Sequence, residues 1–176
     1  KLANNTFRDV SFAFANELAL LADKYNTNAF TLINGANEGY PRNKIPLPSP
    51  GVGGYCLTKD PILFSCTPNG IRKDAVIGLS SRRINESAML YPVKLLKKYA
   101  QKKDKRLSEM TILIMGIAFK GVPETTDVRG SISVDIMKIL TSQVRKIYGW
   151  DAVIGDDELQ KYGFCTAKSL EISVHQ

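Results

Sequence analysis

Apolar residues near the start of the chain recur at spacings of three and four positions. The set is Phe7, Val10, Phe14, Leu18, Leu21 and Tyr25. At about 100° per residue, this spacing gathers the six side chains into one stripe along an α-helix. Lys1, Asn5 and Asn16, together with Phe12, fall on the opposite face. The pattern therefore predicts a long helix with a cation and two amides in line on that face, although an ordinary exposed polar face gives the same pattern.

Residues from about 34 to 50 show neither a helical nor an alternating pattern. They contain Pro41, Pro46, Pro48 and Pro50, and each proline removes an amide donor and disfavours helix in the residue before it. We expect a long loop here, and loops of this length inside compact domains are commonly functional. A new helix is expected at Asp60-Pro61, with the aspartate as its cap and the proline in its first turn.

Residues 73 to about 103 predict one or two further helices. Their shared stripe consists of Ile77, Ile84, Ala88, Tyr91, Leu95 and Tyr99. The composition then changes, because "MTILIMGIAFKG" is the continuous apolar run of a buried parallel strand, "SISVDIMKILTSQ" has helical periodicity, and "VRKIYGWDAVI" predicts a second strand. We expect an α/β protein, in which an all-helical domain (residues 1–103) precedes a partial Rossmann-like parallel domain (residues 108–176).

Charge and cysteine content narrow the function classes. The net charge of +7 arises largely from lysines and arginines around residues 97–106, where a solvated surface is expected and no aromatic residues alternate with the charges as nucleic-acid stacking requires. A basic surface also suits a small anion such as a nucleotide. Cys56, Cys66, Cys165 and the only histidine, His175, have no metal-ligand spacing. No run approaches a membrane span and no secretory signal is visible, so we expect a cytoplasmic protein that binds neither membrane nor nucleic acid.

The stretch "SPGVGGYCLTKDP" places three glycines directly before a thiol. Glycines 51, 53 and 54 allow backbone conformations that other residues avoid and let a ligand approach the main chain. Cys56 is then placed to attack a bound electrophile, with Lys59 available to favour the thiolate and Asp60 to hold a water molecule or accept a proton. A buried, inert cysteine beside a tight turn is the alternative.

Four segments in this order resemble the UDP-glucose/GDP-mannose dehydrogenase family of nucleotide-sugar 6-dehydrogenases. They are "KLANNTFRDVSFAFANELALL", "PGVGGYCLTKDP", "SRRINESAMLYPV" and "ILIMGIAFKGVPETTDVRGS". The resemblance implies a three-part parent enzyme, with an amino-terminal NAD domain, a helical domain that forms a homodimer, and a carboxyl-terminal domain for the UDP part of the substrate. This chain resembles only the second part and the start of the third. We therefore expect a fragment that is inactive alone, arising either from deliberate shortening of the protein or from an incomplete reading frame.

The resemblance also implies roles for individual residues. The family oxidises carbon 6 of a UDP-sugar twice, through a thiohemiacetal and a thioester on a cysteine that matches Cys56, and no metal takes part. Lys1 and Asn5 match residues at the reacting centre, and Asp60 matches an acid that orients water or accepts protons. Residues expected to bind substrate are Gly53, Gly54, Tyr55, Arg42 and Lys120, and Lys120 is also the one candidate in this chain for contact with NAD. Asp127 and Arg129 match a pair that is structural or catalytic.

The exact sugar stays open at this stage. "SPGVGG" and "DVRGSIS" depart from the commoner GPGVGG and DxRESPS without removing a proposed catalytic group. "YPR", with Arg42, favours a UDP-N-acetylhexosamine, whereas "TKD" favours UDP-glucose. A non-catalytic dimerisation and nucleotide-binding module is the competing hypothesis from another functional class.

Overall fold

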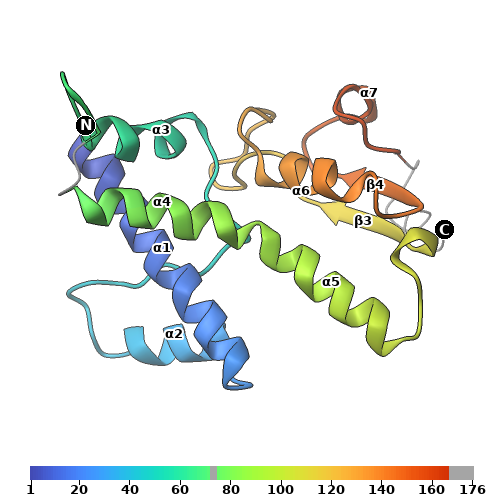
Figure 1. Ribbon diagram of the computed structural model, residues 1–176, viewed down its shortest axis with the longest axis horizontal. Coiled ribbons are helices and arrows are strands. Elements are labelled where there is room, and N and C mark those ends of the chain that lie inside the picture. The colour runs from blue at the N-terminus through green and yellow to red at the C-terminus, as the bar shows by residue number, and fades with distance from the viewer. Residues whose placement is uncertain (72–74, 167–176) are drawn as a thin grey trace. The chain divides into compact units, whose positions relative to one another are not determined.

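The computed structural model describes residues 1–71 and 75–166 of the 176-residue chain (Figure 1). His175 lies outside the described residues, so the expectation that it is not a metal ligand stays a prediction. The chain forms two compact units, Lys1–Met89 and Leu90–Gln176. The division falls between two successive helices of the segment that we expected to be one helical domain.

Unit 1 is built around the long helix α1 (Leu2–Lys24). Its other helices are α2 (Ala29–Asn37), α3 (Tyr55–Phe64) and α4 (Val76–Ala88), and a short hairpin of β1 (Cys66–Thr67) and β2 (Gly70–Ile71) separates the last two. Helix α4 crosses α1 closely (Figure 1). A Cβ atom on Gly78 would lie 3.2 Å from the methyl group of Thr6, so the crossing depends on the absence of that atom.

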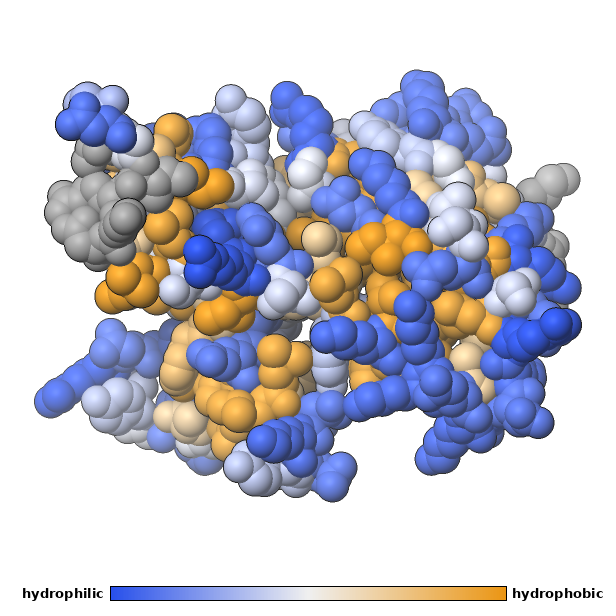
Figure 2. Space-filling model, in the orientation of Figure 1, coloured by the Kyte–Doolittle hydropathy of each residue, from blue (hydrophilic) through white to orange (hydrophobic). Residues whose placement is uncertain are grey.

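The apolar stripe of α1 is not the face that packs in the core. Phe7 and Tyr25 are each 72% exposed and Phe14 is 50% exposed. The buried face is instead small and polar: Thr6, Asp9, Ala13, Ala15, Asn16 and Ala22. Small side chains let α3 and α4 approach α1, which leaves the large apolar ones at the surface. Figure 2 shows hydrophobic residues exposed in the region of α2 and the neighbouring end of α1.

Helix α3 begins earlier than the sequence pattern indicated. It starts at Tyr55, directly after Gly54, whose φ of 86° gives the sharp entry. Pro61 therefore lies inside the helix, and Asp60 is not its cap. The expectation of a helix starting at Asp60-Pro61 was wrong because the glycine, rather than the proline, sets the start.

Helix α2 was not expected from the sequence. The side chain of Asn28 caps it by accepting hydrogen bonds from the backbone N–H groups of Phe30 (2.9 Å) and Thr31 (3.1 Å). The irregular loop consequently begins after residue 37 rather than at 34.

Unit 2 contains the expected β-α-β arrangement. After α5 (Leu90–Lys102) and a 3₁₀ turn (Leu107–Glu109), strand β3 (Thr111–Met115) is followed by α6 (Ile132–Leu140), β4 (Lys146–Trp150) and α7 (Asp156–Lys161). The strands pair in parallel, from Thr111 opposite Lys146 to Met115 opposite Trp150. This pairing confirms the two strands and the crossover helix that the sequence predicted, and it makes the protein a mixed, helix-rich α/β protein. None of the helices in the described ranges is long and apolar enough to cross a membrane.

The packing of β4 predicts a strict requirement for glycine at position 149. A Cβ atom there would lie 2.7 Å from Cγ and 2.9 Å from Cβ of Phe164, atoms too near the backbone to move freely. We expect Gly149→Ala to destabilise unit 2 by about 1–3 kcal/mol through overpacking. Urea unfolding followed by fluorescence of Trp150, the only tryptophan of the chain, measures the effect.

The matched control is Gly121→Ala, because an added Cβ meets no atom within 4 Å there. Equal unfolding midpoints for Gly149→Ala and the unsubstituted chain would contradict this account of the packing.

Candidate functional site

The carboxylate of Asp60 lies at the centre of a polar cluster in unit 1. The residue is 1% exposed. Its Oδ2 accepts a hydrogen bond from the Asn5 amide at 2.5 Å, and its Oδ1 accepts one from the Lys59 ammonium at 2.6 Å. A buried carboxylate needs such partners because burial alone disfavours the charged form. Helices α1 and α3 thus meet through a charged group rather than through apolar contact alone.

Electrostatics connects further predicted residues to this cluster. The hydrogen bonds from Lys59 and then Asn5 lower the pKa of Asp60, and the charge of Lys1 lowers it further. The pKa of Lys59 is raised, chiefly by its hydrogen bond to Asp60 and also by the negative charge that Cys56 can carry. Hydrogen bonds thus join Asn5, Lys59 and Asp60, whereas Lys1 and Cys56 act on this cluster only through weaker charge effects on Asp60 and Lys59.

Cys56 lies in the first turn of α3 and its side chain is exposed. The first turn of a helix has backbone N–H groups without intrahelical partners, and they favour negative charge nearby. The hydroxyl of Thr58 donates to the carbonyl of Gly54 at 3.1 Å and closes this turn. The alternative of a buried cysteine beside a tight turn is wrong, because the thiol is open to reagents and ligands.

The other residues expected to bind the sugar lie around this turn. Gly54 is buried and Gly53 is half-buried, whereas Tyr55 is exposed. The Lys59 ammonium lies 5.0 Å from the centre of the Tyr55 ring, over its face. Arg42 is an exposed residue in the preceding loop. The glycines thus lie next to the thiol, as expected for a loop that presents it.

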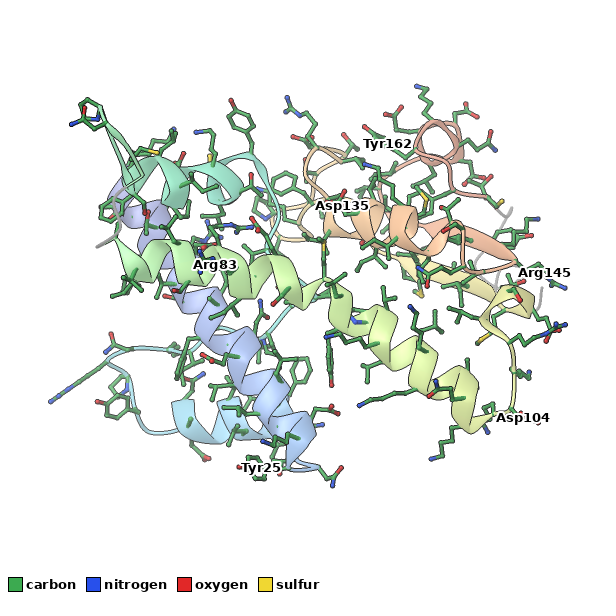
Figure 3. The ribbon with its side chains drawn as sticks, viewed as in Figure 1. Tyr25, Arg83, Asp104, Asp135, Arg145 and Tyr162 are labelled. Atoms are coloured by element: carbon green, nitrogen blue, oxygen red, sulfur yellow. The ribbon has the colours of Figure 1, made fainter. Side chains whose placement is uncertain are left out.

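Sequence reasoning missed a second buried cluster in unit 1. Arg82 and Asp9 form an ion pair of 2.6 Å with both side chains almost completely buried. Ser81 and Asn85 donate further hydrogen bonds to the Asp9 carboxylate, at 2.8 and 2.9 Å. The neighbouring Arg83 is exposed on α4 (Figure 3). The adjacent pair of arginines in "SRRINES" left open which one is buried, and only the helix packing distinguishes them.

In unit 2, a cavity of about 320 Å³ opens where the two parallel strands end. Its lining includes Gly116 and Lys120 after β3 and Trp150 and Asp151 at the end of β4. This is the edge of an open parallel sheet at which ligands bind in such folds. Lys120, expected to reach the substrate, supplies a cation to the lining of the cavity.

Asp151 joins the two loops that form this cavity. Its carboxylate accepts hydrogen bonds from the backbone N–H groups of Ile117 (2.6 Å) and Ala118 (3.0 Å) after β3, and of Val153 (2.9 Å) and Ile154 (3.3 Å) after β4. Burial works to raise the pKa of Asp151, but these N–H groups together lower it. The loop that carries Lys120 is therefore held to the end of the neighbouring strand.

The loop between β3 and α6 also contains an internal ion pair and a backbone hydrogen bond. Asp127 and Arg129 form an ion pair of 2.8 Å, and the hydrogen bond from Arg129 lowers the pKa of Asp127 to about 2. The carbonyl of Asp127 accepts the N–H of Phe119 at 3.0 Å. Because the Arg129 side chain is 85% exposed, solvent screens the pair and its contribution to stability is small. Within residues 1–71 and 75–166, no three His, Cys, Asp or Glu side chains gather as metal ligands.

Comparison with known proteins gives consistent matches. Residues 1–87 match the profile of the UDP-glucose/GDP-mannose dehydrogenase family, central domain. The chain is 38% identical over 163 residues to a UDP-N-acetyl-D-mannosamine dehydrogenase of Pyrococcus horikoshii, covering 92% of this chain and 38% of that protein. It is 34% identical over 144 residues to an NDP-N-acetyl-D-galactosaminuronic acid dehydrogenase of Ralstonia solanacearum, covering 81% of this chain and 31% of the relative.

Solved structures agree with these sequence matches. The structure of a UDP-D-ManNAc dehydrogenase from Pyrococcus horikoshii superposes with a TM-score of 0.84 at 37% identity, over 99% of this chain and 38% of that one. The chain thus spans about two fifths of the length of this relative.

The four hydrogen bonds to Asp151 predict an acid-sensitive unit 2. Because the pKa of Asp151 is lowered in the fold, its stabilising effect is complete above the ordinary carboxyl pKa of about 4 and disappears as the pH falls through the lower native value. We expect Asp151→Asn to lower the free energy of unfolding at neutral pH by about 1–3 kcal/mol, because four backbone N–H groups, two of them in the buried residues Ile117 and Ile154, lose a charged acceptor. The decrease in the free energy of unfolding on acidification should be smaller in this variant.

Trp150 fluorescence during urea unfolding, repeated from about pH 6 down to about pH 2.5, provides the measurement across the range in which the carboxylate takes up its proton. Asp104→Asn is the matched control, since this exposed aspartate lies just beyond α5 (Figure 3). If Asp104→Asn and Asp151→Asn gave the same pH profile, the assignment to Asp151 would be refuted.

Proposed function

The chain belongs to the UDP-glucose/GDP-mannose dehydrogenase family, and on that basis we propose that it is part of an NAD-dependent nucleotide-sugar 6-dehydrogenase that oxidises carbon 6 of its sugar twice. In this proposal, residues 1–103 are the helical domain with the catalytic loop, and residues 108–176 begin the Rossmann-like domain for UDP. The observation that carries the proposal is the accessible thiol of Cys56 in the first turn of α3, the same helix that carries the hydrogen-bonded pair Lys59 and Asp60, with Asn5 bound to Asp60.

The proposed chemistry of Cys56 is covalent. Its thiolate sulfur attacks carbon 6 of the sugar aldehyde, a carbon–sulfur bond forms, and the carbonyl oxygen becomes the alkoxide of a thiohemiacetal. The ammonium of Lys1 and the second amide hydrogen of Asn5 stabilise this oxygen, since the first amide hydrogen is bound to Asp60. The alkoxide then re-forms the carbonyl as a hydride leaves carbon 6, which gives a thioester; NAD would accept this hydride. Water attacks the thioester carbon, the carbon–sulfur bond breaks, and the thiolate and the uronate are released.

The bonding of Asp60 indicates how it takes part. A carboxylate with a lowered pKa keeps its charge and holds a proton weakly. Asp60 is therefore suited to accepting a hydrogen bond rather than to taking up a proton. We assign Asp60 to orienting the attacking water molecule and to fixing Asn5 and Lys59 in place.

The strand ends of unit 2 do not form a dinucleotide site of the usual kind. After β3 the glycines are Gly116 and Gly121, without the G-x-G-x-x-G spacing, and the carboxylate at the end of β4, Asp151, is bound to backbone N–H groups rather than free for a ribose. We therefore assign NAD, the acceptor of both hydrides, to a part of the parent protein beyond this chain. The cavity of unit 2, with Lys120, is assigned to the UDP portion of the substrate.

We favour a UDP-N-acetylhexosamine as the substrate over UDP-glucose. The relatives at 38% and 34% identity are named as dehydrogenases of N-acetylated sugars, and by the resemblance Arg42 matches an arginine with which this branch contacts substrate. The same names count against the alternative of a non-catalytic dimerisation and nucleotide-binding module. In this proposal, the enzyme acts in the cytoplasm.

We further assign a homodimer interface to the exposed apolar stripe of α1. Phe7, Phe14, Leu21 and Tyr25 lie along the helix, and each is at least 46% exposed. A row of large apolar side chains on one helix is typical of an interface, and a second copy of the same helix supplies a matching row.

The covalent role of Cys56 predicts a specific loss. In the full-length protein that contains this chain, Cys56→Ser should lower uronate formation from UDP-N-acetylmannosamine by at least about 1000-fold, because the hydroxyl is a much weaker nucleophile than the thiolate. The measurement is the amount of NADH formed per sugar, with the uronate identified by mass spectrometry. The unsubstituted enzyme should give two equivalents of NADH.

Cys66→Ser is the matched control, since Cys66 is an exposed cysteine of the hairpin and should leave the rate unchanged. Undiminished uronate output from Cys56→Ser would exclude the mechanism. Absence of NADH with every UDP-sugar in the unsubstituted enzyme would support the non-catalytic module instead.

The interface predicts a change in assembly. Sedimentation velocity of this chain at about 50 µM should show a dimer, and Phe14→Asp should convert it to a monomer, because a charge in an apolar interface is desolvated without a partner. Val122→Asp, at a residue 91% exposed in unit 2, is the control and should remain dimeric. A monomeric unsubstituted chain would contradict the proposal.

A further inference from the structure

We propose that Asn16 and Arg82 are positioning residues for the thiol of Cys56. Both are buried side chains of unit 1, and each holds the backbone of the glycine loop (residues 49–54) that leads into α3. The inference concerns the geometry of the loop, and its consequence for catalysis rests on the proposed role of Cys56.

Asn16 anchors the beginning of the loop. It is 3% exposed. Its Oδ1 accepts the backbone N–H of Ser49 at 2.9 Å, and its amide nitrogen donates to Oδ1 of Asn85 at 3.0 Å. One side chain of α1 thus connects the loop to α4, and both ends of the amide are used.

Arg82 anchors the loop three residues further on. Its Nη1 and Nη2 each lie 3.4 Å from the carbonyl oxygen of Val52, as long hydrogen bonds, while Nη1 donates to Asp9 at 2.6 Å. Asp9 is fixed in turn by Asn85, which donates to its carboxylate and to its backbone carbonyl at 2.9 and 3.0 Å. The guanidinium therefore binds α1 and the loop at the same time.

These two anchors hold the part of the loop that contains its glycines. Gly51 has a φ of 130°, and its carbonyl accepts the hydroxyl of Ser49 at 2.6 Å. Gly54, two residues before Cys56, has a φ of 86°. Glycines in such conformations lose much backbone entropy on folding, so the loop needs specific contacts to hold one geometry. Ser49 and Val52 are the points at which Asn16 and Arg82 provide them.

A buried polar cluster is not needed for stability as such. Replacing a buried ion pair by apolar residues of similar volume is frequently neutral or stabilising. Apolar packing, however, does not orient a carbonyl or an N–H group in the way that an amide and a guanidinium do. The polar cluster therefore orients backbone groups of the loop in addition to filling the space between α1 and α4.

The test compares the loop with the rest of unit 1. In Asn16→Ala, hydrogen exchange of the backbone N–H groups of residues 49–58 should accelerate by about 10-fold or more relative to α4, because the loop opens locally. In this segment the N–H of Ser49 donates to Asn16 and the N–H of Thr58 donates to the Gly54 carbonyl. Ala22→Gly is the matched control, since it weakens the buried face of α1 away from the loop. It should not change the ratio of the exchange rate in the loop to that in α4. Arg82→Lys, which keeps a cation for Asp9 but loses the planar fork, should accelerate exchange in the same segment and serves if Asn16→Ala does not fold.

Catalysis is measured separately in the full-length enzyme. Asn16→Ala should lower kcat by about 10-fold to 100-fold with KM for the UDP-sugar changed less than about twofold, because the nucleophile is misplaced while the rest of the binding site is retained. Ala22→Gly should keep its kcat.

Unchanged loop exchange in both Asn16→Ala and Arg82→Lys would overturn the proposal, and so would faster exchange with an unchanged kcat. If Cys56→Ser itself remained active, the proposed function would fail, whereas the exchange result would still decide whether these residues hold the loop.

Discussion

Two buried carboxylates that require hydrogen-bonded partners determine how the helices of unit 1 pack. Asp9 and Asp60 are almost fully buried, and a charge removed from water is tolerated only with a close, hydrogen-bonded counterpart. Asp9 takes its cation from α4 and Asp60 takes its partners from α1 and from its own helix. These two requirements bring three helices together around the glycine loop, and small residues on α1 make the approach possible.

The same helix therefore serves two different environments. Its small and polar side faces the inside of unit 1 and carries Asn5, Asp9 and Asn16, whereas its large apolar residues face outward. In the proposed enzyme, the inner face organises the nucleophile and the outer face joins two copies. An apolar stripe left at the surface is costly for a monomer in water, so a covered interface accounts for both faces at once.

Unit 2 is organised by the ends of its parallel strands. A single carboxylate, Asp151, ties the loop after β3 to the loop after β4. Hydroxyl groups at the start of α6 add ties to the same region, from Ser131 to the Ile117 carbonyl and from Ser133 to the Gly116 carbonyl, each at 2.6 Å. In dinucleotide-binding domains an acid at a corresponding place is available to a ribose. Here the carboxylate is part of the scaffold, which agrees with the proposal that this unit does not hold NAD.

Local sequence patterns were sufficient for the long first helix, for the β-α-β order, and for an exposed thiol shortly after the glycines, because each depends on residues close together in the chain. They connected Lys1 and Asn5 with Cys56 and Asp60 only through a family resemblance. Which face of α1 is buried, which arginine of the adjacent pair binds Asp9, and where α3 begins were decided by the tertiary structure. The physical reason is that burial and ion pairing depend on segments 55 or more residues apart meeting in space, and periodicity along one helix carries no information about its neighbours.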